Sequence, residues 1–248
     1  MAKAGPRSEK IAIFRFIAGV LIPPLSLIAK LQVIDAEKLP KSGPVVISPN
    51  HINELDPVLV GWAIWRLGRA PRFLAKASLF SVPVVGWLLR KAGQVPVERS
   101  GAVRGHDPLA AGRRLVDEGL AVVVYPEGSL TRQPDLWPMR GKFGAVRLAL
   151  ENNVPLIPVA HWGDQKIMQR YGKKLSLFPR KPVWVKFGDP VDLSAYAGKQ
   201  HDSAALAEAT TLVMLAITDL LADLREETPP DRLWDPAEHN QTEIGRFD

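Results

Sequence analysis

From residue 31 onward, short apolar runs bounded by turn residues alternate with longer stretches that carry apolar residues at helical spacing. The short runs predict strands, and the longer periodic stretches predict helices. We expect strands at residues 31–34, 45–48, 72–76, 94–98, 120–124, 155–160 and 183–187, and helices at 56–67, 78–91, 109–118, 141–152 and 203–224. Strands that alternate with helices favour an α/β fold, with a mostly parallel central sheet flanked by helices.

The segment before the first strand is strongly apolar but interrupted. Residues 11–22 form one apolar run, and Pro23-Pro24 separates it from a second apolar piece at residues 25–29. The first run has twelve residues, whereas a helix that crosses a membrane needs about 20. We therefore predict a pair of short helices in a membrane interface, with basic residues toward the lipid headgroups. These basic residues are Lys3, Arg7, Lys10 and Arg15.

Two other interpretations of this N-terminal segment remain open. A signal peptide also has a basic start and an apolar run, but no small-x-small cleavage site follows here. An ordinary core helix is the stronger alternative. We divide the chain into an N-terminal interfacial helical motif at residues 1–30, an α/β domain at 31–227 that carries the candidate chemistry, and an irregular acidic tail at 228–248.

Composition narrows the classes of partner. The 248 residues include no cysteine, which excludes disulfides, cysteine-ligated metal and a thioester carried on the protein. The net charge is +6, but residues 225–248 hold seven acidic and three basic residues, so the preceding body carries about +10. Phosphorylated small molecules and anionic lipids suit such a body. Nucleic acid suits it less, because the basic residues form no arm and no known nucleic-acid-binding motif is present.

The stretch from Ser48 to Pro57 carries the first candidate for chemistry. A buried strand delivers His51 to a loop, and Asp56 follows five residues later at the start of a predicted helix, as a potential N-cap. If the loop curls, the Asp56 carboxylate can orient the His51 ring and leave its other nitrogen free as a base. The alternative is that His51 is a turn residue and Asp56 only a helix cap.

Other polar residues follow other predicted strands, and parallel strands bring their carboxyl ends to one edge of a sheet. Arg99 directly follows a strand and has the geometry to clamp a phosphate, although a bare arginine at such a position is more often a surface residue. A histidine base with several cations near it indicates a reaction in which a proton is removed close to a phosphate group of the substrate. No G-x-S-x-G motif is present, which disfavours a serine hydrolase. The additional candidates are Lys76, Glu127, Gly128, Ser129 and Lys142.

Four blocks in fixed order resemble the glycerolipid acyltransferase family, which includes the bacterial 1-acylglycerol-3-phosphate acyltransferases. The first block is Asn50-His51 followed by four residues and Asp56. The second comprises Gly93 and the tripeptide at residues 97–99, and the fourth is the Pro-containing apolar strand at 154–158. The third block matches at residues 125–129. Leu130, however, occupies the usual arginine position, and an arginine appears only at Arg132.

The resemblance implies transfer of a fatty acyl group from a thioester to a glycerol hydroxyl. His51 would take the hydroxyl proton, and Asp56 would hold the tautomer of its ring. Arg99 and Lys76 would hold the acceptor phosphate, and Arg132 would replace the family arginine. The acceptor pocket would be shaped by Glu127, Gly128 and Ser129, with Lys142 nearby.

On this basis we expect an enzyme of phospholipid biosynthesis that converts lysophosphatidic acid to phosphatidic acid. Its co-substrate would be acyl-coenzyme A or acyl carrier protein, with no metal, no further cofactor and no nucleic-acid partner. We expect a peripheral or monotopic protein at the cytoplasmic face of a membrane. The alternatives are acylation of another lysolipid or of a glycolipid headgroup, and a non-catalytic lipid-binding module.

Overall fold

A seven-stranded sheet forms the centre of the described part of the chain, in the order β1-β7-β6-β2-β5-β3-β4. The computed structural model describes residues 9, 11–97 and 108–242, with the backbone alone at 108–111. All neighbouring strands are parallel except β6 and β7, which confirms the predicted α/β fold. The strands are β1 (Ala29–Ile34), β2 (Val45–Pro49), β3 (Arg72–Lys76), β4 (Val95–Val97), β5 (Ala121–Val123), β6 (Leu156–Trp162) and β7 (Lys181–Phe187).

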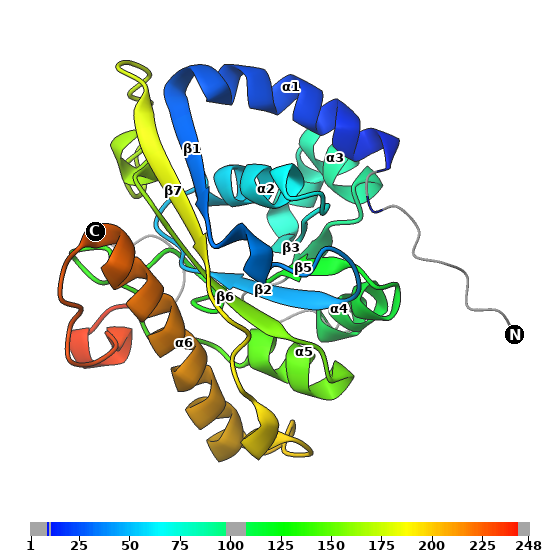
Figure 1. Ribbon diagram of the computed structural model, residues 1–248, viewed down its shortest axis with the longest axis vertical. Helices are drawn as coiled ribbons and strands as arrows, with labels where there is room; N and C mark the ends of the chain where they lie inside the picture. The colour runs from blue at the N-terminus through cyan, green and yellow to red at the C-terminus, as the bar shows by residue number, and fades with distance from the viewer. Residues whose placement is uncertain (1–8, 10, 98–107, 243–248) are drawn as a thin grey trace, which may run out of the picture.

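Helices cover both faces of this sheet (Figure 1). Side chains alternate along β2, so Val45 and Ile47 pack toward α2, whereas Val46 packs toward α5 and α6 on the opposite face. β2 is therefore buried on both sides, which explains its continuous apolar sequence. The helices are α1 (Ala12–Ile28), α2 (Asp56–Arg66), α3 (Val85–Lys91), α4 (Pro108–Asp117), α5 (Gly144–Asn152) and α6 (Ser203–Arg225), and short 3-10 turns lie at Ala36–Lys38, Ala77–Ser81, Asp164–Lys166, Ser194–Tyr196 and Pro236–His239.

The N-terminal segment is one helix, so the predicted pair of helices broken at Pro23-Pro24 was wrong. α1 runs through both prolines without interruption. Two adjacent prolines remove two backbone donors from a helix interior, which is costly. The inner face of α1 offsets this cost because Phe14 and Leu25 are buried against the body of the protein. The helix then passes directly into β1, whose first residue, Ala29, pairs with β7.

The long helix α6 meets the length and hydropathy expected of a membrane span, and in the described part of the chain it is the one helix that does so. Half of that apolar window is buried inside the protein. The buried side includes Val213, Met214 and Ile217, which pack on the sheet beside α5. Its apolar character therefore belongs to the core, as its helical spacing predicted.

The tail that follows α6 folds back onto the loop after β5. The backbone of Trp234 forms a parallel bridge with Met139 and accepts a hydrogen bond from the Arg140 N–H at 2.8 Å. Apart from this bridge and the turn at Pro236–His239, residues 228–242 contain no regular element. The irregular tail was predicted for residues 228–248, of which 243–248 lie outside the described residues.

Candidate active site

The candidate residues lie at the edge of the sheet where β2, β3, β5 and β6 end. β2 is parallel to β5 and to β6, and β3 is parallel to β5. The carboxyl ends of all four strands therefore point the same way. His51 follows β2 by two residues, Lys76 ends β3, and Glu127 lies just beyond β5. Ligands bind at this edge of open α/β sheets. The topology therefore gathers side chains that are far apart in the sequence.

The loop between His51 and Asp56 curls as the general-base interpretation requires. The Asp56 Oδ2 lies 2.9 Å from the His51 Nδ1, and it also accepts the backbone N–H groups of Ile52 at 2.5 Å and Asn53 at 3.1 Å. Asp56 is the first residue of α2 and makes no cap of its own helix, so its predicted N-cap role was wrong. The carboxylate turns back into the preceding loop instead.

The second ring nitrogen of His51 is available to a substrate. Because an ionised Asp56 only accepts hydrogen bonds, Nδ1 donates to it, and in the neutral ring this tautomer places the lone pair on Nε2. Among the described residues, Nε2 has no hydrogen-bond partner. The ring of Tyr125 stacks on the imidazole with centroids 4.1 Å apart, which fixes the ring plane. His51 is thus an oriented imidazole whose second nitrogen has no partner among the described residues.

A second histidine, which the sequence analysis missed, lies behind Asp56. The His161 Nε2 is 2.8 Å from the carbonyl oxygen of Asn50 and 3.4 Å from Asp56 Oδ2, and its Nδ1 is 3.0 Å from Asp164 Oδ1. Both ring nitrogens therefore face acceptors, an arrangement that suits a protonated ring. Burial opposes this charge, but the two carboxylates outweigh it and raise the pKa of His161 well above 6.5.

The charge of His161 in turn stabilises the ionised carboxylate of Asp56. Burial alone would raise the pKa of Asp56, but His161 and the hydrogen bonds from His51 lower it far below 3.8. For Asp164, burial prevails and raises the pKa to about 6. His161 is the second-last residue of the buried strand β6 and Asp164 follows it three residues later, so both lie at a strand tip, the same signal that identified His51. That signal was available in the sequence.

Asp56, His161 and Asp164 also offer ligand atoms within 4.8 Å of one another, close enough to consider a metal ion. Each of these atoms already serves another protein group: both His161 nitrogens face oxygens, and Asp164 Oδ2 accepts the Asn53 side-chain N–H at 2.6 Å. The donor set therefore fits a closed hydrogen-bond cluster better than a cation site.

Glu127 links the Pro-Glu-Gly turn to His51 through the backbone. Its Oε1 accepts the His51 N–H at 2.8 Å, and its Oε2 accepts the Met139 N–H at 3.2 Å. The side chain is fully buried. Burial raises the pKa of Glu127 to about 8, against the effect of these two donors. Glu127 thus holds the backbone of His51 in place.

The raised pKa of Glu127 predicts a pH-dependent stability. An acid whose folded pKa lies above its unfolded value of 4.5 costs stability as pH rises from 4.5 through about 8. Wild type should therefore lose stability across this window by a few kcal/mol more than Glu127→Gln. Urea unfolding at the two ends of the window measures the difference. Glu54→Gln, at an exposed position in the His51 loop, is the control and should follow wild type; parallel curves for all three proteins would contradict the prediction.

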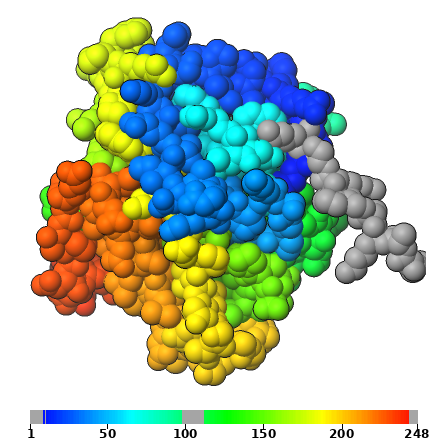
Figure 2. All heavy atoms as spheres, viewed as in Figure 1, coloured from blue at the N-terminus to red at the C-terminus, as the bar shows by residue number. Residues whose placement is uncertain are grey.

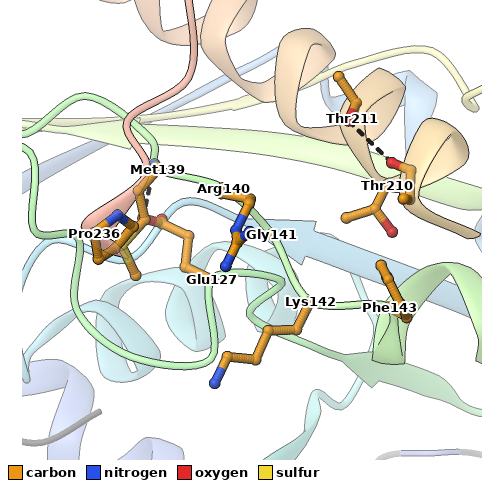
Figure 3. Close-up of a pocket in the computed structure, with 10 residues that line it drawn as sticks. Glu127, Met139, Arg140, Gly141, Lys142, Phe143, Thr210, Thr211 and Pro236 are labelled. Carbon is orange, nitrogen blue, oxygen red and sulfur yellow. Dashed lines mark hydrogen bonds between the residues drawn. The ribbon is translucent and has the colours of Figure 1, made fainter. Parts of the chain in front are cut away.

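Lys142 lines a cavity of about 360 Å³ (Figure 3), and Gly128 lies against the Lys142 side chain. Gly128 has φ of +69°, and a Cβ there would meet the Lys142 side chain at 3.0 Å, so glycine is required. The cavity lies between residues 139–143 and α6, with Thr210 on the helix side. His51 is not among its lining residues, whereas Glu127, which accepts the His51 N–H, is one of them.

The remaining candidates lie in different settings. Ser129 is buried, and its hydroxyl lies 3.4 Å from the Leu130 carbonyl. Arg132 is fully buried and donates to the Tyr171 hydroxyl at 2.9 Å and to the Thr242 carbonyl. Since its guanidinium binds protein oxygens inside the fold, Arg132 is not placed to take over the family arginine's contact with a headgroup. The buried Leu130 offers no such contact either.

The two predicted phosphate ligands are Lys76 and Arg99. Lys76 is exposed at the end of β3, on the same edge as His51. Arg99 lies outside the described residues, and so does Glu98 of the same block. The phosphate contact of both cations therefore stays a prediction from the resemblance.

The sheet edge, the Asn50-His51-x4-Asp56 loop and the Pro-Glu-Gly turn that supports it together define a protein of the acyltransferase class. The Acyltransferase family matches residues 30–162, more than half of the chain, and the chain belongs to this family.

Individual relatives agree with this assignment. A chloroplastic 1-acyl-sn-glycerol-3-phosphate acyltransferase of Brassica napus is 33% identical over 140 residues, which cover 56% of this chain and 39% of the relative. The 1-acyl-sn-glycerol-3-phosphate acyltransferase of Bacillus subtilis is 29% identical over 198 residues, covering 79% of this chain and 92% of the relative. The chain thus spans about two fifths of the plant relatives but nearly all of the bacterial one.

The fold also has a solved counterpart. The crystal structure of the 1-acyl-sn-glycerophosphate acyltransferase PlsC from Thermotoga maritima superposes with a TM-score of 0.65 and covers 88% of this chain and 81% of that one. At 23% sequence identity, this similarity establishes the shared fold alone.

Proposed function

We propose that the protein transfers a fatty acyl group from an acyl thioester to the free hydroxyl of lysophosphatidic acid, giving phosphatidic acid for phospholipid biosynthesis. The observation that carries the proposal is the oriented His51, whose Nδ1 lies 2.9 Å from Asp56 and whose Nε2 is open. Membership of the acyltransferase family supports the reaction class. The names of the bacterial relatives support the acceptor.

In the proposed reaction, the His51 Nε2 removes the proton of the acceptor hydroxyl as its oxygen attacks the thioester carbonyl. The negative Asp56 stabilises the imidazolium that forms. The tetrahedral intermediate then collapses, the carbon–sulfur bond breaks, and the imidazolium returns its proton to the departing thiolate. Atoms and charges balance without a metal ion or redox cofactor, and either coenzyme A or acyl carrier protein can supply the thiol.

The rigid surroundings of His51 suit this role. Glu127 fixes the backbone at His51, and Tyr125 fixes the ring plane. Behind them, His161 shares the Asp56 carboxylate and keeps it ionised. A base that is held from three sides loses little orientational freedom when a substrate binds, which is how positioning lowers a barrier. By resemblance, Lys76 and Arg99 would receive the acceptor phosphate.

We also propose that α1 rests in a membrane interface, which would place the protein as a peripheral or monotopic protein on the cytoplasmic face. α1 is apolar on both sides: Phe14 and Leu25 face the body, whereas Phe16, Val20 and Leu27 are exposed by 53% to 65%. Exposed apolar residues at helical spacing are typical of interfacial helices. Both substrates are amphiphiles, so this position would let them enter without crossing water.

The test is thiol release from palmitoyl-coenzyme A by the purified protein in detergent. We expect release with lysophosphatidic acid and none with lysophosphatidylinositol or without an acceptor. Release with lysophosphatidylinositol alone would show that Leu130, in the usual arginine position, accompanies a different headgroup. If no acceptor supports release from either palmitoyl-coenzyme A or palmitoyl-acyl carrier protein, the enzyme proposal fails, and a lipid-binding module becomes the better interpretation.

A further inference from the structure

The connection between β6 and β7 ends in an exposed apolar tip. All eight residues from 173 to 180 are exposed, and the large side chains Leu175, Leu177 and Phe178 are exposed by 50%, 45% and 74%. Single exposed apolar residues are ordinary, but three within four positions form a patch that indicates an interaction surface. None of the sequence motifs of the active site includes this segment.

The tip is held in a fixed conformation. The buried Lys181 ammonium donates to both the carbonyl oxygen and the hydroxyl of Ser176, at 2.6 Å and 2.8 Å. The Ser176 N–H donates to the Ile167 carbonyl at 2.8 Å. These bonds anchor Ser176 to the body of the protein, and Leu175 and Leu177 on either side of it are exposed. The exposure of the leucines follows from this anchoring.

The tip lies next to α1. The Arg180 Nε donates to the carbonyl of Ala29, the residue that follows α1, at 3.2 Å, and Lys181 pairs with Ala29 in the sheet. Figure 1 shows the tip, in yellow, beside the C-terminal end of α1, and Figure 2 shows both at the same end of the molecular surface. The tip thus continues the exposed apolar side of α1 across β1.

The topology also relates this surface to the active site. β7 is antiparallel to β6, so the connection between them begins at the carboxyl end of β6. β6 is parallel to β2, and His51 lies beyond the carboxyl end of β2. The connection and His51 therefore share one edge of the sheet. In addition, Arg170, which precedes the tip, donates to the Thr131 carbonyl at 2.7 Å, beside the Pro-Glu-Gly turn.

The charges at the tip indicate which class of partner it binds. Lys173, Lys174 and Arg180 are exposed around the apolar side chains, and residues 173–181 contain no acidic residue. Apolar side chains ringed by cations match the interface of an anionic bilayer, where the apolar groups enter the acyl boundary and the cations meet phosphate groups. A protein partner would need a complementary acidic, apolar groove, for which no feature of the chain argues.

We propose that the 173–180 tip and the outer face of α1 form one composite contact with an anionic membrane, which turns the edge that carries His51 toward the lipid. The proposal rests on the proposed function, because it gives the same site its route to lipid substrates. The tip adds a second, cationic contact to that of α1. Two contacts fix the orientation of the protein on the membrane, whereas one helix alone would let the protein rotate.

The test is co-sedimentation of the full chain with phosphatidylcholine vesicles, with and without phosphatidylglycerol. Leu177→Ser/Phe178→Ser should weaken binding to the anionic vesicles about tenfold or more. Lys173→Glu/Lys174→Glu should weaken it about tenfold on anionic vesicles and little on neutral ones. The matched control is Leu212→Ser/Leu215→Ser, two leucines on α6 that are 41% and 42% exposed, and it should bind like wild type.

Thiol release in detergent micelles separates this proposal from the proposed function, because micelles deliver substrate without a bilayer. Loss of vesicle binding by the tip variants with unchanged micellar activity supports the proposal. Vesicle binding that depends on the tip in a protein without acyltransferase activity would support the contact and reject the function. Tip variants that bind vesicles like wild type would overturn the proposed membrane contact. If the wild-type protein is then found to be a dimer, and the tip variants are monomers, the tip is a self-association surface.

Discussion

Replacing His51 by alanine should lower the turnover number for thiol release by about 10³-fold, with the fold intact. A positioned general base contributes about 10²- to 10⁴-fold to a reaction of this kind. His161 cannot substitute, because it is buried and both of its nitrogens face protein oxygens. The loss should appear in the turnover number, since His51 acts on the proton in transfer and not on the acceptor phosphate.

His201→Ala is the matched control, because His201 is exposed in the turn before α6 and should have no effect on turnover. Circular dichroism and urea unfolding check that His51→Ala still folds, since the lost stacking on Tyr125 should cost about 1 to 2 kcal/mol. A folded His51→Ala protein that keeps more than about a tenth of wild-type turnover would remove His51 from the role of base.

Most of the fold could be predicted from the sequence because the apolar runs are short and bounded by turn residues. The strand expected at residues 72–76 coincides with Arg72–Lys76, and that at 183–187 differs from Lys181–Phe187 only at its start. Each of these two strands lies between two paired neighbours in the sheet. The pairing of His51 with Asp56 was predictable for a related reason: both lie in one short loop, so only its curvature was uncertain.

Properties that depend on contacts between distant segments could not be obtained in this way. The path of α1 through Pro23-Pro24 depends on packing against the rest of the fold, which local propensity does not contain. The burial of Arg132 depends on Tyr171 and Thr242, 39 and 110 residues away. His161 differs from these, because its place at the end of a predicted parallel strand already put it at the edge that carries His51.

Replacing Asp56 by asparagine should be nearly as damaging as losing the base itself, by about 10² to 10⁴ in turnover, because it reverses the tautomer of His51. Asp56 accepts from the His51 Nδ1 and from the backbone of Ile52 and Asn53. An asparagine keeps an oxygen for the backbone donors and presents its amide hydrogens to Nδ1. The ring hydrogen then moves to Nε2, which can no longer take the substrate proton. Raising the pH should not restore activity, since the tautomer and not the charge is wrong.

The same substitution should also destabilise the fold, by about 3 kcal/mol, because it leaves the buried His161 with one carboxylate in place of two. The pKa of Asp56 is lowered on folding, so its contribution is present above 3.8 and is lost as pH falls below that value. The stability gap between wild type and Asp56→Asn should therefore be full at neutral pH and narrow below pH 3.8.

Urea unfolding across this pH range, together with thiol release at neutral pH, separates the two consequences of Asp56→Asn. Asp219→Asn, at an exposed position on α6, removes a carboxylate outside the site and should change neither measurement. A variant that is destabilised as expected but retains wild-type turnover would show that Asp56 serves His161 and the loop, and not the base. Loss of turnover at unchanged stability would instead show that Asp164 alone is enough to stabilise the charge of His161. Asp56 would then act mainly by orienting His51.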